Sequence, residues 1–287
     1  MGNGEWRINN ALTNPQLLIT NLSGGNMQKQ GRLLLVGLIV VLVGVGLYLV
    51  LQSSSKSQPA DKINVEAVQA QMDAGQYTAA RDALEKLVAV EPENAEAHFM
   101  LGLTYFNLGD YAKARASFTQ AMTLEPQRAA AVHHNLGVLA YQTGEMETAV
   151  TEFKAALAAD PNDPDSHYQL GATYLQIAIS TSDLAYLQQA ESEFEQALAL
   201  APGKPEALVG LGTLYLNQNR IAEAIALLEQ AVQGNPQMRE ALFALGMAYF
   251  AGGDIAAAKT TLQQFLDTQP PEQWANEARE IITQLGP

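Results

Sequence analysis

The stretch HFMLGLTYFNLGDY, residues 98–111, has the spacing of an amphipathic helix but carries a glycine, Gly102, near its centre. Glycine inside a helix costs about 1 kcal/mol relative to alanine. A helix tolerates this cost where a second helix packs so closely against it that only a small residue fits. The stretch therefore predicts the first helix of a tightly packed pair, with the Gly-Asp dipeptide at 109–110 in the turn between the two helices.

The same pattern recurs along the chain at a nearly fixed period. Leu-Gly dipeptides are spaced so that their glycines lie 35, 34, 41 and 34 residues apart: 101–102, 136–137, 170–171, 211–212 and 245–246. Each unit also carries an alanine followed four residues later by an aromatic residue or leucine, and ends near a proline. The large residues are Leu84, Phe118, Phe153, Phe194, Leu228 and Leu262. One helix pair cannot bury its apolar face alone, so stacked neighbours must supply the core.

This pattern resembles the tetratricopeptide repeat (TPR) family, whose unit of about 34 residues places Leu-Gly, Tyr, a turn, Ala, an aromatic residue, Ala and Pro in that order. Residues 95–126, AEAHFMLGLTYFNLGDYAKARASFTQAMTLEP, match it nearly throughout. The resemblance implies an all-α fold, a right-handed α-solenoid of six helix hairpins over residues 61–272 with a capping helix at 273–287. The expected repeats are 61–94, 95–129, 130–163, 164–204, 205–238 and 239–272. The first is degenerate, with Val68 in place of the glycine.

The fourth repeat carries seven extra residues around IAISTSDLAYL, residues 177–187. Seven residues are close to two helical turns, so one interpretation is that both helices are longer, with Ser182 or Asp183 capping the second. The alternative is a protruding lip that contacts a partner.

The most apolar part of the chain is LLLVGLIVVLVGVGLYLVL, residues 33–51, which contains no charged residue. Its length as a helix matches the hydrocarbon core of a bilayer, about 30 Å, and predicts a transmembrane helix in preference to a core helix or a cleaved signal peptide. Residues 1–32 are expected to be disordered, with a possible true start at Met27, and residues 52–60 form a polar linker. The distribution of lysine and arginine on either side of this segment slightly favours a cytoplasmic N-terminus. We therefore expect a single-pass protein of the bacterial inner membrane whose repeats lie outside the cytoplasm.

Charge is divided unevenly between the two parts of the chain. Residues 1–60 hold four basic side chains and one acidic side chain, a net charge of +3. Because the whole chain has a net charge of −14, residues 61–287 have a net charge of −17. Such an acidic surface repels phosphate backbones, so nucleic acid is not an expected partner. The absence of cysteine excludes disulfides and zinc–thiolate sites.

Few residues offer catalytic or metal-binding chemistry. His98, His133 and His167 recur at one repeat position where the family usually buries a large ring, so we interpret them as packing residues and not as metal ligands. No Ser-His-Asp order, phosphate loop or nucleotide-binding fingerprint is present. The sequence predicts a protein that is not an enzyme, with no cofactor, no metal and no small-molecule substrate.

The resemblance also implies where a partner binds, because TPR arrays bind peptides along the concave face formed by their first helices. The positions carried over from the family are Phe99, Leu103, Phe106, Asn107, His134, Val138, Tyr141, Tyr168, Leu175, Phe243, Met247 and Phe250. None is basic, which argues against capture of an acidic tail. Such an apolar groove suits an amphipathic helix or a basic client. Ordinary packing between repeats remains an alternative explanation of these side chains.

Together these features predict a membrane-anchored, chaperone-like scaffold that binds a client peptide or helix during assembly or maturation of envelope proteins. Its architecture looks like that of bacterial proteins that act in cytochrome c biogenesis or beside the translocon. The alternative is a permanent structural subunit of an envelope complex, such as a pilus or a secretion machine.

Overall fold

The computed structural model describes residues 64–286 of the chain. The expected disordered segment 1–32, transmembrane helix 33–51 and linker 52–60 lie outside the described residues. Within the described part, no helix combines the length and the apolar character that crossing a membrane requires.

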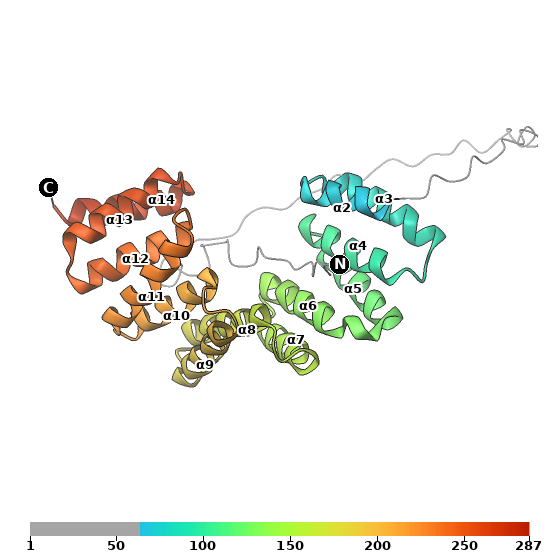
Figure 1. The fold of residues 1–287 in the computed structure, drawn as a ribbon, viewed down its shortest axis with the longest axis horizontal. Coiled ribbons are helices and arrows are strands. Elements are labelled where there is room, and N and C mark those ends of the chain that lie inside the picture. Colours follow the sequence, from blue (N-terminus) through green and yellow to red (C-terminus); the bar gives the residue numbers. More distant parts are fainter. Residues whose placement is uncertain (1–63, 287) are drawn as a thin grey trace, which may run out of the picture.

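The described residues form thirteen α-helices and no strand, which confirms the predicted all-α repeat fold (Figure 1). The helices are α2 (Val65–Asp73), α3 (Tyr77–Val90), α4 (Ala95–Asn107), α5 (Tyr111–Leu124), α6 (Ala129–Thr143), α7 (Met146–Ala159), α8 (Pro164–Thr181), α9 (Leu184–Leu200), α10 (Pro205–Asn217), α11 (Ile221–Gly234), α12 (Arg239–Gly252), α13 (Ile255–Asp267) and α14 (Glu272–Gln284). A short 3₁₀ helix at Pro126–Arg128 precedes α6.

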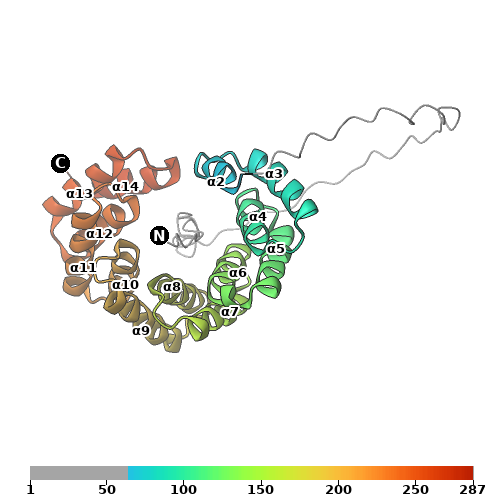
Figure 2. The same cartoon turned by 45° about the vertical axis from the view of Figure 1, so that its right-hand side comes forward.

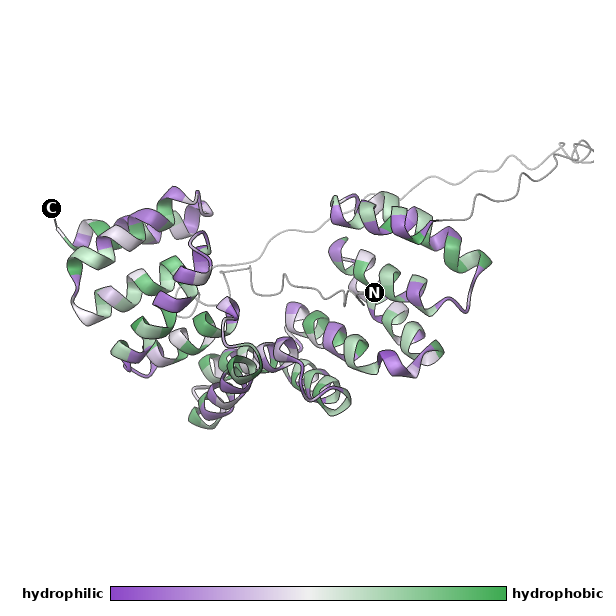
Figure 3. Cartoon of the chain, viewed as in Figure 1, coloured by the Kyte–Doolittle hydropathy of each residue, from purple (hydrophilic) through white to green (hydrophobic). Residues whose placement is uncertain are grey.

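The helices pair along the chain and the pairs stack into a curved array. Figure 2 shows the first helix of each pair, α4, α6, α8, α10 and α12, on the inside of the curve, and their partners α5, α7, α9, α11 and α13 on the outside. The chain ends in α14, which lies on the inner side next to α12 and α13. Hydrophobic and hydrophilic residues alternate along the helices, as expected for amphipathic helices that bury one face (Figure 3).

Close approach within each pair explains the recurring glycine. A Cβ atom on Gly137 would lie 2.6 Å from the ring of Phe153, and one on Gly171 would lie 2.9 Å from the ring of Phe194. These distances are shorter than any normal carbon–carbon contact. The large side chain of the second helix, which is fully buried, therefore occupies the space that a side chain on the first helix would need.

The turns follow the local sequence. Gly109, Gly144 and Gly253 adopt the left-handed conformation at the ends of first helices, with φ near 80°. Asparagine or aspartate caps several of the helices that follow a turn, because its side chain accepts a hydrogen bond from a free backbone N–H in the first turn. These capping residues are Asn64, Asn94, Asp110, Asp163, Asp183 and Asp254.

The seven extra residues of the fourth repeat lengthen both of its helices. Helix α8 has 18 residues and α9 has 17, against 13 and 14 in the following repeat. Asp183 caps α9 by accepting a hydrogen bond of 2.9 Å from the N–H of Ala185. Ser182 instead lies in the turn in the left-handed conformation, so only the second of the two expected caps is used.

Candidate peptide-binding site

Most of the residues predicted to line a peptide groove are buried within the array. Nine of the twelve are buried: Phe99, Leu103, Phe106, His134, Val138, Tyr141, Tyr168, Leu175 and Phe243. Met247 is half-buried, whereas Asn107 and Phe250 are exposed. The nine buried residues therefore contribute to packing in the described structure.

Three of the buried rings pack against a buried aromatic ring on the second helix of their own repeat. The ring centroids of Phe99 and Phe118 are 5.6 Å apart, and those of Phe243 and Phe265 are 5.1 Å apart. Tyr168 lies 6.0 Å from Phe194 in the same way. Such tilted pairs are a favoured arrangement of aromatic rings in protein cores. An aromatic residue at this repeat position thus tells little about a ligand unless it also faces open space.

Three of the predicted residues come together at a cavity of about 530 Å³ in the C-terminal half of the array. Tyr141 reaches it from α6, and Tyr168 and Leu175 reach it from α8. Further lining residues that the sequence reasoning missed are Gln169, Phe194, Glu206, Gly210, Met238, Arg239, Glu240 and Trp274. The other nine predicted residues do not line this cavity.

Several of the missed residues belong to later helices, α10, α12 and α14, which line the cavity together with α8. Trp274 is on α14, which the repeat pattern assigned only a capping role, yet its ring stacks on Phe243 with the centroids 5.6 Å apart. Gly210 is on α10, two residues before Gly212 of the Leu-Gly pattern. A Cβ atom on Gly210 would be 2.6 Å from the ring of Phe194. A signal existed in the sequence for both: a tryptophan in an otherwise polar helix, and a second glycine two residues before Gly212.

Both tyrosines of the cavity are neutral hydrogen-bonding groups at physiological pH. Burial raises the pKa of the Tyr141 phenol to about 12. Burial also raises the pKa of Tyr168 well above its usual value, and the nearby carboxylates, Glu206 foremost, add to this shift. Among the carboxylates that act on Tyr168, Glu206 and Glu240 line the cavity itself. Its electrostatic environment is therefore acidic.

The neighbouring cations are already engaged. Lys204 forms an ion pair with Asp165, with the Nζ–Oδ1 distance 2.5 Å, and lies 3.6 Å from Oε2 of Glu206. The guanidinium of Arg239 donates a hydrogen bond of 3.0 Å to the backbone carbonyl of Thr268. Lys204 thus offsets part of the charge of Glu206, whereas Arg239 is held by the C-terminal end of α13.

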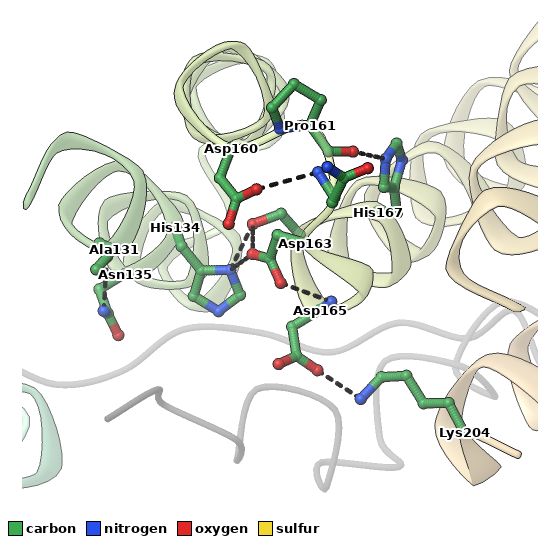
Figure 4. A network of polar contacts seen from close by, with 11 residues as sticks. Ala131, His134, Asn135, Asp160, Pro161, Asp163, Asp165, His167 and Lys204 are labelled. Carbon is green, nitrogen blue, oxygen red and sulfur yellow. Dashed lines mark hydrogen bonds and ion pairs between the residues drawn. The ribbon is translucent and has the colours of Figure 1, made fainter. Parts of the chain in front are cut away.

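A buried polar cluster joins the third repeat to the fourth (Figure 4). Ser166 donates a hydrogen bond of 2.5 Å to Oδ2 of Asp163, and its Oγ lies 2.8 Å from Nδ1 of His134. The same Nδ1 lies 3.7 Å from Oδ2 of Asp163. All three side chains are buried. His134, expected on the concave face, is thus part of an inter-repeat contact.

The order of these groups differs from that of a catalytic triad. In a triad, histidine stands between serine and aspartate and uses a different ring nitrogen for each. Here the serine hydroxyl points at the aspartate, and one ring nitrogen of His134 faces both. The cluster therefore positions α6 against the start of α8 and does not activate a nucleophile.

The other three histidines make recurring structural contacts. Each is half-buried, and each uses a ring nitrogen to contact a neighbouring oxygen. These oxygens are the carbonyl of Pro92 at 3.0 Å for His98, the carboxylate of Glu152 at 2.7 Å for His133, and the carboxylate of Glu193 at 2.6 Å for His167. Across residues 64–286, no group of three or more histidines or carboxylates is arranged to hold a metal ion.

Comparison with known families agrees with the helix pairs. A model described as tetratricopeptide repeat matches residues 65–129, 183–239 and 209–272, which is more than half of the chain. A second model, described as TPR repeat, matches residues 137–177. The chain belongs to the tetratricopeptide repeat family. Proteins of this family bind protein or peptide partners.

The chain is also similar to an individual curated protein. The photosystem I assembly protein Ycf3 of Synechococcus sp. (strain CC9605) is 28% identical over 102 residues, which cover 34% of this chain and 59% of that protein. The chain thus spans about three fifths of the length of this relative.

Among solved structures, pilF of Pseudomonas aeruginosa has a TM-score of 0.63 at 19% identity and covers 75% of this chain and 95% of its own. PilW, a widely conserved type IV pilus biogenesis factor, has a TM-score of 0.60 at 20% identity, covering 69% and 89% respectively. At these identities the two structures show a common fold.

Proposed function

We propose that the chain is a membrane-anchored scaffold that binds a client peptide or helix on its concave face and assists assembly or maturation of an envelope or membrane protein. The observation that carries this proposal is the cavity among α8, α10, α12 and α14. It lies on the inner face of the array and is lined by Tyr141, Tyr168 and Leu175, which the family pattern assigns to partner binding.

Two features of the sequence support the cellular part of the proposal. The apolar run 33–51 has the length of a membrane span, and the basic residues before it favour a cytoplasmic N-terminus. The repeats would then lie outside the cytoplasm, in the manner of a bacterial inner-membrane protein. The similarity to Ycf3, which is named as an assembly protein, supports a role in assembling other proteins.

Photo-crosslinking in living cells tests the binding face directly. A photoreactive residue placed at Gln176 or at Val209, both lining the cavity, should capture the same partner. The matched control is Gln230, an exposed residue of α11 on the outer layer of helices (Figure 2). The proposal fails if neither inner position captures a protein, or if Gln230 captures the same partner as efficiently.

The same cells distinguish a scaffold from a permanent structural subunit. A scaffold that binds clients transiently should migrate separately from them after extraction in mild detergent. Co-migration of all copies with one stable complex would instead favour a structural subunit of an envelope machine. Protease protection in spheroplasts tests the topology, because repeats outside the cytoplasm are digested without lysis.

A further inference from the structure

Unpartnered polar atoms gather at the cavity. The described residues contain four buried side-chain nitrogen or oxygen atoms without a hydrogen-bond partner, and three of them belong to cavity residues. These are Oε1 of Gln169, Oε1 of Gln176 and Nε1 of Trp274. Gln169 and Trp274 are each only 5% exposed. Buried polar groups in proteins are nearly always hydrogen-bonded, so these three atoms take their partners from whatever occupies the cavity, which is water in the free protein and can be a ligand in a complex.

The positions of these atoms fit a peptide main chain. Gln169 and Gln176 are seven residues apart on α8, which is about two turns or roughly 10 Å along one wall. Trp274 offers a donor from α14. A main chain carries both N–H donors and carbonyl acceptors along its length, so it can satisfy the amides and the indole N–H together. An amide side chain that rotates by 180° exchanges its acceptor for a donor, and a main chain accommodates either arrangement.

The charges at the cavity select among peptides. Glu206 and Glu240 line it, and the lining cation, Arg239, is directed at the carbonyl of Thr268. Two lining carboxylates against one lining guanidinium leave the cavity with a net negative charge, so it attracts a lysine or arginine and repels a carboxylate. Apolar side chains also line the cavity, with Leu175 and Val209 among them.

We propose that this cavity binds a peptide segment in which a lysine or arginine is flanked by apolar side chains. The basic group pairs with Glu206 and Glu240, the main chain bonds to the two glutamines, and a main-chain carbonyl accepts the indole N–H of Trp274. The capping helix is then part of the binding site as well as the end of the fold. This inference rests on the proposed function and names the chemical class of its client.

A phage-displayed library of short random peptides provides the probe. It is selected on the full-length chain in mild detergent, and binders to a Trp274→Phe, Gln169→Leu variant are removed by counter-selection. The expected result is a consensus with one basic residue between apolar ones. An acidic consensus, a purely apolar consensus or no enrichment would overturn the inference.

Calorimetry with the synthesised consensus peptide then assigns the contacts. Glu206→Gln combined with Glu240→Gln should weaken binding about tenfold or more and reduce its dependence on salt. Trp274→Phe keeps a stacked ring, removes the N–H, and should weaken binding about threefold or more. The control variant, Glu147→Gln with Glu195→Gln, changes two exposed carboxylates of outer helices and should leave binding unchanged. Equal effects of the two double variants would refute the assigned contacts.

The two levels of the proposal fail separately. Capture of a partner at Gln176 and Val209 without a basic consensus would leave the scaffold function standing and remove the inference about the client. Absence of capture at both positions would remove the proposed function itself. Thermal melting of each variant by circular dichroism identifies any loss of binding that comes from unfolding.

Discussion

Gly102 lies directly against the ring of Phe118: a Cβ atom on this glycine would be 2.5 Å from Cδ1 of the ring. The same relationship recurs with Phe153, Phe194, Leu228 and Leu262 in the later repeats. Each repeat thus gives up helix propensity in its first helix so that a large residue of its second helix can fill the core. The glycine lowers helix propensity, but it leaves the space in which the large side chain is buried.

Replacing Gly102 with alanine should destabilise the array despite the better helix propensity of alanine. The propensity gain is about 1 kcal/mol, whereas forcing a methyl group into a filled core costs about 1–3 kcal/mol. Because Phe118 is fully buried, its ring has little room to move. We expect a net loss of up to about 2 kcal/mol in the free energy of unfolding, measured by urea denaturation.

Gly234 provides the matched control for this substitution. It is the last residue of α11, and a Cβ there would lie 3.9 Å from the nearest atom, in Pro205, an ordinary contact. Gly234→Ala should therefore be neutral or slightly stabilising. Equal destabilisation by both substitutions would show that the close approach of Gly102 to Phe118 is not what requires the glycine.

Removing the Asp163 side chain should cost more than removing another aspartate cap. Asp163 caps α8 and also accepts the buried hydroxyl of Ser166, whereas Asp183 caps α9 at an exposed turn. Loss of a cap costs about 0.5–2 kcal/mol, and a buried donor left without a partner adds about 1–3 kcal/mol. Thermal melting of Asp163→Ala and Asp183→Ala compares the two, and a larger effect of Asp183→Ala would contradict this account.

The fold was predictable from the sequence because the same contact between a glycine and a large residue occurs within each repeat from the second to the sixth. Gly102 and Phe118 lie 16 residues apart, in one unit, and their contact recurs wherever the motif recurs. The family pattern therefore predicted the helix pairs. The length of the seven-residue insertion, which departs from that pattern, suggested the longer helices of the fourth repeat as one of two interpretations.

The cavity was predictable only in part, since it depends on how the units curve. Tyr141, Tyr168 and Leu175 were found from their repeat positions, but Trp274 lies about 100 residues or more from each of them along the chain, in a helix outside the repeats. His134 illustrates the opposite error. Its repeat position predicted the concave face, yet it forms a buried polar cluster with Asp163 at the end of its own repeat and Ser166 at the start of the next. No pattern within one unit contains the contact with Ser166.

Helix α12 offers a test of which predicted groove residues serve packing. Phe243 is buried between Phe265 and Trp274, whereas Phe250, on the same helix, is 37% exposed. Phe243→Ala should lower the free energy of unfolding by about 3–5 kcal/mol, because it leaves a cavity in the core. Phe250→Ala should change it by less than about 1 kcal/mol. Urea denaturation of the two variants measures the difference, and similar values would contradict the assignment of Phe243 to the core.

Alkaline pH should weaken the array through its buried tyrosines. The pKa of Tyr141 is raised from 10.0 to about 12 by burial, so the folded state holds the neutral phenol more strongly than the unfolded chain does. The stability that this preference contributes is fully present below pH 10 and is lost as pH rises toward 12. For a shift of this size the loss approaches about 2–3 kcal/mol, and Tyr168, with its pKa raised in the same direction, adds to it.

The variant Tyr141→Phe isolates this effect, because it removes the titrating hydroxyl and keeps the ring. Urea denaturation at a series of pH values from 9 to 12 should show a shallower loss of stability for the variant than for the natural chain. The two curves should separate as pH rises above 10, because only the natural chain has to ionise a buried phenol. Parallel curves over this range would mean that Tyr141 ionises equally well in both states, and hence that the cavity wall around it is open to water.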